Sequence, residues 1–271
     1  MTEIISASHD VVFKALFVRN PDVLRAFLRD VLDLPLTDDD EVTILNPELI
    51  PETADGKLSR LDIHVKMAHR KFNIEMQARK KGFDAERVLY YWCEMYSEDF
   101  ESGGKYEDLE KTYSVNVLGF NYLDCPEYHS SYSIREDKRF DMLTDKLSIH
   151  IFELPKVPKE HISSDNKQMW MELIKADSEE ALEMVRTTTQ NPAIQKGIDA
   201  VYALNADTAL REKIRQRDKA IRDYENEMAI ARNEGKAEGK VEERNSIADN
   251  MRKNGFTEEQ IKLALGDACV Y

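Results

Sequence analysis

Two carboxylates and an amide stand at a spacing that could hold a metal ion. Asp62, Glu75 and Gln77 form the pattern Asp-x12-Glu-x-Gln. Two carboxylates that converge on one site bind Mg²⁺ well, because this hard cation prefers oxygen ligands at roughly 2.0–2.1 Å. Such an ion can activate water and neutralise the leaving oxygen of a phosphodiester. The alternative is that both acids lie on the solvated face of a half-exposed hairpin.

Alternating residues on both sides of a short polar turn predict the hairpin that would position these groups. In residues 61–65 and 72–77, apolar and polar side chains alternate with a period of two, as in a strand with one buried face. Glu75 and Gln77 then project from one face about 7 Å apart, and a partner strand can bring Asp62 beside them. His64 shares the Asp62 face, but Mg²⁺ prefers oxygen, so an ordinary polar histidine is the favoured interpretation.

Helices and further strands are predicted around this hairpin. An apolar stripe indicates a helix over about residues 11–17, capped by Ser8 or Asp10. Pro21 suits the first turn of a second helix. The remaining predicted elements are strands at 42–45, 113–120 and 147–152 and a helix at about 85–100. This order predicts an α/β or α+β core with a mixed sheet.

The texture of the chain divides it into four parts. The expected parts are a core over 1–158, a helical region packing on it over 159–205, a charged helix over 206–245 and a small helical tail over 246–271. Residues 207–245 interleave ten basic and ten acidic side chains, which favours a solvated helix or a coiled coil that forms a homo-oligomer. Gly235 and Gly239 either let two helices approach closely or weaken an exposed helix. The tail reads as two small helices, the second capped by Thr257.

The overall charge excludes some classes of function. The chain of 271 residues has 38 basic and 52 acidic side chains, a net charge of −14, which argues against a protein that coats nucleic acid. Residues 57–87, however, hold nine basic and four acidic side chains, a local net charge of +5. A narrow basic footprint on an acidic body is compatible with brief contact with DNA. Widely spaced cysteines, no apolar run of membrane-spanning length and no secretory leader indicate a cytoplasmic protein without a membrane partner.

Several motifs together resemble one known family. They are Asp10–Phe17, which is similar to an opening D-x-x-F-K-x-x-F; the D-x12-E-x-Q core; the helix with Arg87, Tyr90 and Tyr91; Gly104-x-Tyr106-x-x-Leu109; the strand Tyr113–Phe120; and the Glu-Gly-Lys repeat before the tail. In these features the chain resembles the PD-(D/E)XK nuclease superfamily. More specifically, it resembles the PD-(D/E)XK nuclease family transposases, also called the recombination-promoting nuclease (Rpn) family.

The resemblance implies a fold, an activity and a set of site residues. The implied fold is an α/β, restriction-endonuclease-like core with a mixed sheet flanked by helices, plus a C-terminal helical extension. The implied activity is a DNA endonuclease that uses Mg²⁺ or Mn²⁺, with Asp62 and Glu75 as metal ligands and the Met76 carbonyl as an additional one. Gln77 occupies the usual lysine position, so it can orient water but supplies no charge. Leu61 stands where the superfamily's proline precedes the acid.

Other residues have both a functional and a structural interpretation. Asp10 is either a further acid at the metal or a helix cap, and Lys14 is either a phosphate or carboxylate contact or a surface lysine. Arg79, Lys80 and Lys81 either contact DNA or form a solvated charge run. The aromatic side chains of the following helix either stack on unpaired bases or, as the favoured interpretation, pack on the sheet; they are Tyr90, Tyr91, Trp92 and Tyr96.

The leading hypothesis is therefore a divalent-metal-dependent DNA endonuclease that is associated with transposases and promotes recombination. A second hypothesis is a catalytically silent DNA-binding or assembly module that retains the nuclease fold. Its motivation is the acidic chain, the missing lysine and the long charged helix. A third is cleavage of RNA.

Overall fold

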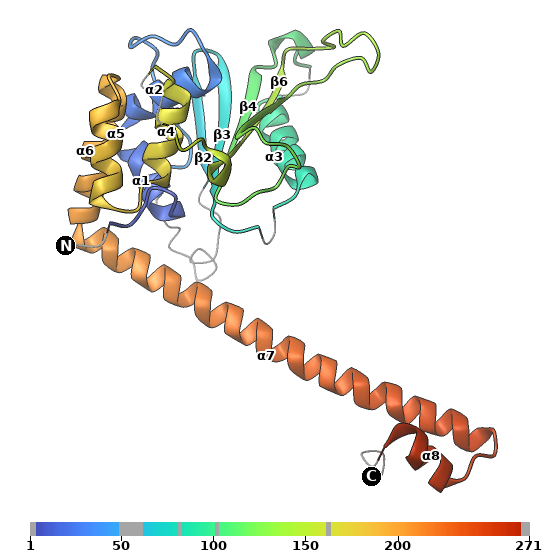
Figure 1. Ribbon diagram of the computed structural model, residues 1–271. Helices are drawn as coiled ribbons and strands as arrows, with labels where there is room; N and C mark the ends of the chain where they lie inside the picture. The colour runs from blue at the N-terminus through green and yellow to red at the C-terminus, as the bar shows by residue number, and fades with distance from the viewer. Residues whose placement is uncertain (1–3, 49–61, 81–82, 101–102, 161–163, 267–271) are drawn as a thin grey trace. The chain divides into compact units, whose positions relative to one another are not determined.

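A single mixed sheet lies within residues 1–214 of the computed structural model, which describes residues 4–48, 62–80, 83–100, 103–160 and 164–266 (Figure 1). Its strand order is β1-β2-β3-β4-β6-β5. The strands are β1 (Thr43–Ile44), β2 (Ile63–Met67), β3 (Arg70–Gln77), β4 (Lys111–Leu118), β5 (His129–Tyr132) and β6 (Leu147–Glu153). β3, β4 and β6 run parallel, whereas β1, β2 and β5 pair antiparallel with their neighbours.

Helices cover both faces of this sheet, as Figure 1 shows. They are α1 (Asp10–Arg19), α2 (Pro21–Leu32), α3 (Ala85–Ser97), α4 (Asn166–Lys175), α5 (Glu179–Thr188), α6 (Pro192–Ala206), α7 (Thr208–Lys253) and α8 (Glu258–Leu265), with 3₁₀ turns at Tyr106–Asp108 and Leu154–Lys156. α1, α2, α4 and α6 join the main apolar core, and α3 packs on β3 and β4 from the other side. The expected α/β core of a mixed sheet flanked by helices, with a C-terminal helical extension, is confirmed.

The apolar positions of the hairpin anchor it in the core. Ile63, Val65, Phe72 and Ile74 are fully buried, and Met76 is nearly so. They point toward the helices that carry Phe13, Phe27 and Trp170 into the same cluster. Alternation then requires the intervening polar residues of β2 and β3 to lie on the opposite face.

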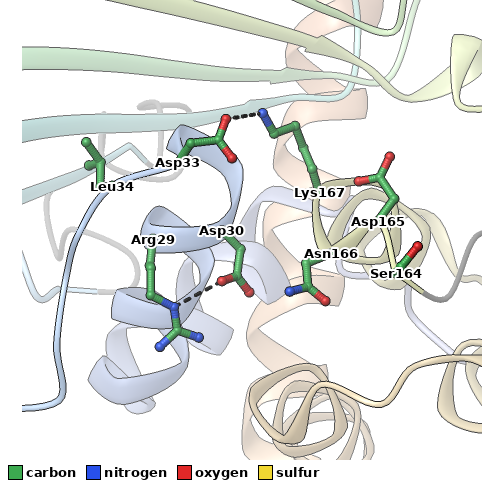
Figure 2. A pocket seen from close by; sticks show the side chains of 8 residues that line it. All are labelled: Arg29, Asp30, Asp33, Leu34, Ser164, Asp165, Asn166 and Lys167. Atoms are coloured by element: carbon green, nitrogen blue, oxygen red, sulfur yellow. Dashed lines mark hydrogen bonds and ion pairs between the residues drawn. The ribbon is translucent and has the colours of Figure 1, made fainter.

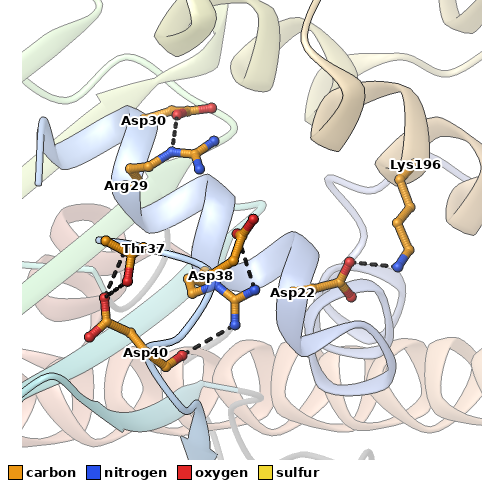
Figure 3. A network of polar contacts seen from close by, with 8 residues as sticks. Asp22, Arg29, Asp30, Thr37, Asp38, Asp40 and Lys196 are labelled. Carbon is orange, nitrogen blue, oxygen red and sulfur yellow. Dashed lines mark hydrogen bonds and ion pairs between the residues drawn. The ribbon is translucent and has the colours of Figure 1, made fainter. Parts of the chain in front are cut away.

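A buried carboxylate ties three helices together on the apolar side. Asp30 Oδ2 on α2 accepts hydrogen bonds from Trp170 Nε1 on α4 at 2.9 Å and from Asn191 Nδ2 at the start of α6 at 2.8 Å. Arg29 Nε donates to its other oxygen at 3.0 Å, a contact drawn in Figure 3. Because Trp170 is completely buried, its indole N–H depends on this acceptor.

The structure corrects three details of the sequence interpretation. His9, rather than Ser8 or Asp10, is the N-cap of α1, and its ring nitrogen accepts from the Val11 amide. β5 was not expected, because its polar sequence His-Ser-Ser-Tyr lacks the alternation of a half-buried strand. The two small helices of the tail are in fact the end of α7 and α8. The cap of α8 at Thr257, in a capping box with Gln260, is confirmed.

The chain separates into two compact units, residues 1–214 and 215–271. The first contains the sheet and α1–α6, together with the first turns of α7, whose Leu210 and Ile214 belong to the main core. The second contains the rest of α7 and α8. Among the described residues, no helix is both long and apolar enough to cross a membrane.

We predict that Asp30→Ala lowers the free energy of unfolding by about 2–4 kcal/mol, because the buried indole N–H of Trp170 and the half-buried amide of Asn191 lose their acceptor. Urea denaturation of the full chain measures this. Asp22→Ala is the matched control, since Asp22 forms a solvent-accessible ion pair with Lys196, also drawn in Figure 3, and should cost less than about 1 kcal/mol. Equal losses in the two variants would contradict the structural role given to Asp30.

Candidate functional site

The register of the β2–β3 hairpin brings the two predicted metal ligands face to face. Ile63 pairs with Ile74, and the pairing continues regularly to Met67 and Arg70 at the turn. One step in the other direction along the same antiparallel register sets Asp62 opposite Glu75. Residues opposite each other in such a pair have Cβ atoms about 4.5–5.5 Å apart, so the two carboxylates reach a common space.

The side chain of Asn46, just after β1, holds the backbone at Asp62 in place. Its Nδ2 donates to the Asp62 carbonyl at 3.1 Å, and its Oδ1 accepts from the His64 amide at 2.8 Å. Leu45 N adds a backbone bond to the His64 carbonyl at 2.8 Å. Sequence reasoning missed Asn46, because a polar residue before a proline reads as loop. Its two bonds extend the sheet edge to the position where the first carboxylate is needed.

The side chains of His64 and Lys14 lie beside Asp62. His64 Nε2 contacts Asp62 Oδ2 directly. Burial raises the pKa of the Asp62 carboxyl, but the hydrogen bond and charge of His64, with a smaller contribution from Lys14, outweigh that effect and hold this pKa below its ordinary value. Asp62 is therefore a carboxylate at neutral pH, the form that binds a cation.

Lys14 is a buried cation near the carboxylates of Asp62 and Glu48. It lies on α1 and is only 4% exposed. Burial lowers the pKa of its ammonium group, and the charges of Asp62 and Glu48 offset only part of that effect. The interpretation of Lys14 as an ordinary surface lysine is therefore wrong. Glu48 was not singled out in the sequence, since nothing in its local pattern indicates that its charge acts on Lys14.

Glu75 lies next to buried polar side chains of β4 that are hydrogen-bonded to one another. It is 7% exposed and pairs in register with Asn116 of β4. Asn116 is itself buried, and its Nδ2 donates to Ser114 Oγ at 3.0 Å and to the His150 carbonyl at 3.2 Å. These bonds fix the neighbouring strand, so the Glu75 carboxylate projects from a rigid surface.

The Met76 carbonyl points toward the Asp62 side of β3. Gly119 N donates to the Gln77 carbonyl at 2.9 Å, so that carbonyl faces β4. Successive carbonyls of a strand point to opposite edges, which directs the Met76 carbonyl toward β2. The described part of β2 begins at Ile63, paired with Ile74. The Met76 side chain lies in the apolar core, only 4% exposed, and leaves the backbone oxygen as the group offered to the site.

Gln77 ends β3 on the same face as Glu75. Its Nε2 donates to the Arg79 carbonyl at 3.0 Å, which leaves the amide oxygen to orient a water.

Asp10 lies in the first turn of α1, where its Oδ1 accepts from the Val11 amide at 2.8 Å. That contact matches an acid at a helix start, and the role of Asp10 at the metal stays a prediction.

The predicted DNA-contacting segment follows β3 directly. Arg79 and Lys80 are exposed, and Lys81 lies outside the described residues.

The aromatic side chains of α3 divide between two roles. Trp92 packs on the sheet, with Nε1 donating to the Thr112 carbonyl at 2.8 Å, whereas Tyr90 is 58% exposed. The favoured interpretation that this stripe packs on the sheet therefore holds for Trp92 and not for Tyr90.

The donor set fits a hard divalent cation. Two carboxylates and a backbone carbonyl are oxygen ligands, and Mg²⁺ commonly completes its coordination with waters and substrate phosphates. Among the described residues, no three His, Cys, Asp or Glu side chains cluster closely enough to hold a metal by themselves. A protein-only cage, such as a structural zinc site, is therefore not formed by these residues, and an open site with few protein ligands is the arrangement that they support.

A separate hollow between α2 and the start of α4 does not share this chemistry. Its volume is about 590 Å³. Figure 2 shows its charged groups engaged with each other: Lys167 Nζ donates to Asp33 at 2.9 Å, and Arg29 bonds to Asp30. The candidate centre is the polar face at Asp62 and Glu75.

Comparison with known proteins gives a family for this arrangement. Residues 7–231 match the family model described as PD-(D/E)XK nuclease family transposase, a range that includes the first helix, the hairpin and most of the sheet-bearing unit. No curated protein and no solved structure matches the chain. The matched range covers most of the 271 residues. With this match added to the mixed sheet and the opposed acids, the chain belongs to the PD-(D/E)XK nuclease family transposases.

Proposed function

We propose that the protein is a cytoplasmic, divalent-metal-dependent DNA endonuclease that hydrolyses phosphodiester bonds and promotes DNA recombination. The observation that carries the proposal is the register that sets Asp62 opposite Glu75, with the Met76 carbonyl directed to the same side. These three groups would hold Mg²⁺ or Mn²⁺, which supplies an activated water and neutralises charge on the leaving oxygen.

The chain's own residues supply the remaining tasks. Lys14 contributes a buried positive charge beside Asp62, in the place of the charge that Gln77 cannot give. Its ammonium group binds a phosphate oxygen as negative charge develops on it, and electrostatic stabilisation is strong in a partly dehydrated site. Gln77 orients the attacking water through its amide oxygen. Arg79, Lys80 and Lys81 contact the flanking phosphates.

The second candidate is a catalytically silent DNA-binding or assembly module with the same fold. It draws support from Gln77, since an amide in the lysine position removes one source of rate enhancement. The acidic body, with a net charge of −14, predicts that DNA binding weakens steeply with salt under either candidate. Cleavage separates the two candidates, and RNA and DNA substrates assayed side by side separate a deoxyribonuclease from a ribonuclease.

We predict that the isosteric variants Asp62→Asn and Glu75→Gln each nick supercoiled DNA at least about 100-fold more slowly than the wild type. Each loses a charged ligand of an ion whose contribution is several kcal/mol. Gel assays in Mg²⁺ or Mn²⁺ measure the rate, and EDTA should abolish nicking by the wild type. The carboxylate control is Asp22→Asn, which should nick normally. Equal rates in all four proteins would overturn the assignment.

We predict that Lys14→Met nicks DNA on the order of 100-fold more slowly, yet melts at the same temperature as the wild type or higher. Methionine fills a similar volume without placing a charge in a buried position. Asp62 keeps its contact with His64 in this variant. Calorimetry and the nicking assay together provide the measurement.

Lys196→Met is the control for the Lys14 variant, because Lys196 lies in a solvent-accessible ion pair. It should change neither nicking nor the melting temperature by much. A Lys14→Met protein that nicks at the wild-type rate would show that the buried ammonium has no part in catalysis.

We propose in addition that α7 mediates self-association. Ile221, Tyr224 and Met228 follow the 3,4 spacing of a coiled-coil seam, and Tyr224 and Met228 are 47% and 50% exposed. At Gly235 and Gly239 an added Cβ would meet nothing within 4 Å, so nothing in the described part of the chain uses the space these glycines leave. A second copy of the helix is the partner whose seam would match.

Light scattering tests this with the full chain. The wild type should have at least twice the 31.4 kDa of one chain, and Met228→Glu should reduce that mass because it puts a charge into the seam. Asn226→Glu changes an exposed position on another face of α7 and should leave the mass unchanged. A monomeric wild type would refute the self-association.

A further inference from the structure

One polar atom on the face that carries Glu75 lacks a hydrogen bond. Asn73 on β3 is 4% exposed, and its Oδ1 is buried without a partner among the described residues. Burying an acceptor without a new hydrogen bond costs free energy, because the hydrogen bond to water is lost and not replaced. Such groups are rare in native proteins, and those that occur are commonly explained by an ion, a water or a functional role.

The neighbours of Asn73 across the sheet are engaged elsewhere. Its register partner on β2 is His64, whose Nε2 contacts Asp62. Its partner on β4 is Ser114, whose Oγ accepts from Asn116 Nδ2 at 3.0 Å. His64 is therefore engaged with Asp62, and Ser114 with Asn116. Neither of them donates a hydrogen bond to Asn73 Oδ1.

The neighbours of Asn73 along β3, Lys71 and Glu75, also have other partners or another role. Lys71, two residues before Asn73 on the same face, donates to the Met95 carbonyl of α3 at 2.9 Å and pairs with Asp99 at 2.8 Å. Glu75, two residues after, is the candidate metal ligand. A spacing of two residues in a strand is about 7 Å, which exceeds a direct hydrogen bond. A cation about 2.1 Å from Glu75, a water about 2.1 Å from that cation and a hydrogen bond of about 2.8 Å to Asn73 together span such a separation.

We propose that Asn73 is a positioning residue of this site: its carboxamide oxygen accepts a hydrogen bond from a water that coordinates the divalent cation beside Glu75. The inference rests on the proposed function, since it requires that cation. It explains why a buried position of β3 carries an acceptor where an apolar side chain would satisfy the fold. Groups that orient metal ligands from outside the coordination shell commonly change metal affinity or activity by 10–100-fold.

The test compares Asn73→Leu with the wild type in Mn²⁺ binding and in stability. Titration calorimetry of the full chain should show Mn²⁺ bound about 10-fold more weakly by the variant. In EDTA the variant should unfold at the same urea concentration as the wild type or a higher one, because a buried acceptor without a partner has been removed. Asn73→Asp, which keeps an acceptor oxygen, should bind Mn²⁺ at least as tightly as the wild type.

Thr112→Val is the control on the same face of the sheet. Thr112 is fully buried, and its hydroxyl donates to the Glu110 carbonyl at 3.3 Å. Losing that satisfied hydrogen bond should lower stability and leave Mn²⁺ affinity unchanged. This is the opposite of the pattern expected for Asn73→Leu.

Three outcomes overturn the inference, and they separate it from the proposed function. Wild-type Mn²⁺ affinity in a folded Asn73→Leu, or weakened binding in Asn73→Asp, refutes the role of Asn73 alone, provided that Glu75→Gln abolishes binding. Should the leucine variant not fold, the result with Asn73→Asp decides. If Glu75→Gln binds Mn²⁺ like the wild type, the metal site itself is wrong and both proposals fail.

Discussion

The register of β2 against β3 is the constraint on which the rest of the structure depends. Side chains alternate along each strand, so a slip of one residue would turn Asp62 and Glu75 into the core and expose Ile63 and Ile74. The burial of those apolar side chains against α1, α2, α4 and α6 opposes such a slip. The two-residue turn also fixes the register, because Ala68 and His69 both have positive φ, at 49° and 55°, as type I′ hairpin turns require. The packing of the core and the turn therefore fix the positions of the two carboxylates.

The site accepts polar burial that the fold alone would not favour. Lys14 is a nearly buried ammonium, and Asn73 carries a buried oxygen without a partner. By contrast, the Asp30 carboxylate in the same unit accepts hydrogen bonds from Trp170 and Asn191. Locally unfavourable groups beside the candidate metal ligands, with Lys14 near Asp62 and Asn73 two residues from Glu75, are the pattern expected where binding competes with stability.

Much of this arrangement could be predicted from the sequence, because alternation is a local signal. Residues 61–65 and 72–77 alternate clearly enough to predict the hairpin and a polar face that carries Asp62 and Glu75. Contacts between distant segments were not predictable in this way. The burial of Lys14, the support from Asn46 and the position of Glu48 depend on how α1 and the end of β1 pack, which no local period encodes. Likewise, β5 has a polar sequence and forms because the edge of β6 offers hydrogen bonds.

The acidic body and the basic stretch at 57–87 now have a structural context. Much of that stretch lies on or directly after β2 and β3, so positive charge accompanies the strands that carry the acids. On the proposed function, Asp62, Glu75 and the Met76 carbonyl bind one divalent cation. Anomalous diffraction from crystals of the full chain soaked in Mn²⁺ tests it most directly. We expect an anomalous peak within bonding distance of all three oxygens. Mn²⁺ bound only at other carboxylates, with this position empty, would contradict it.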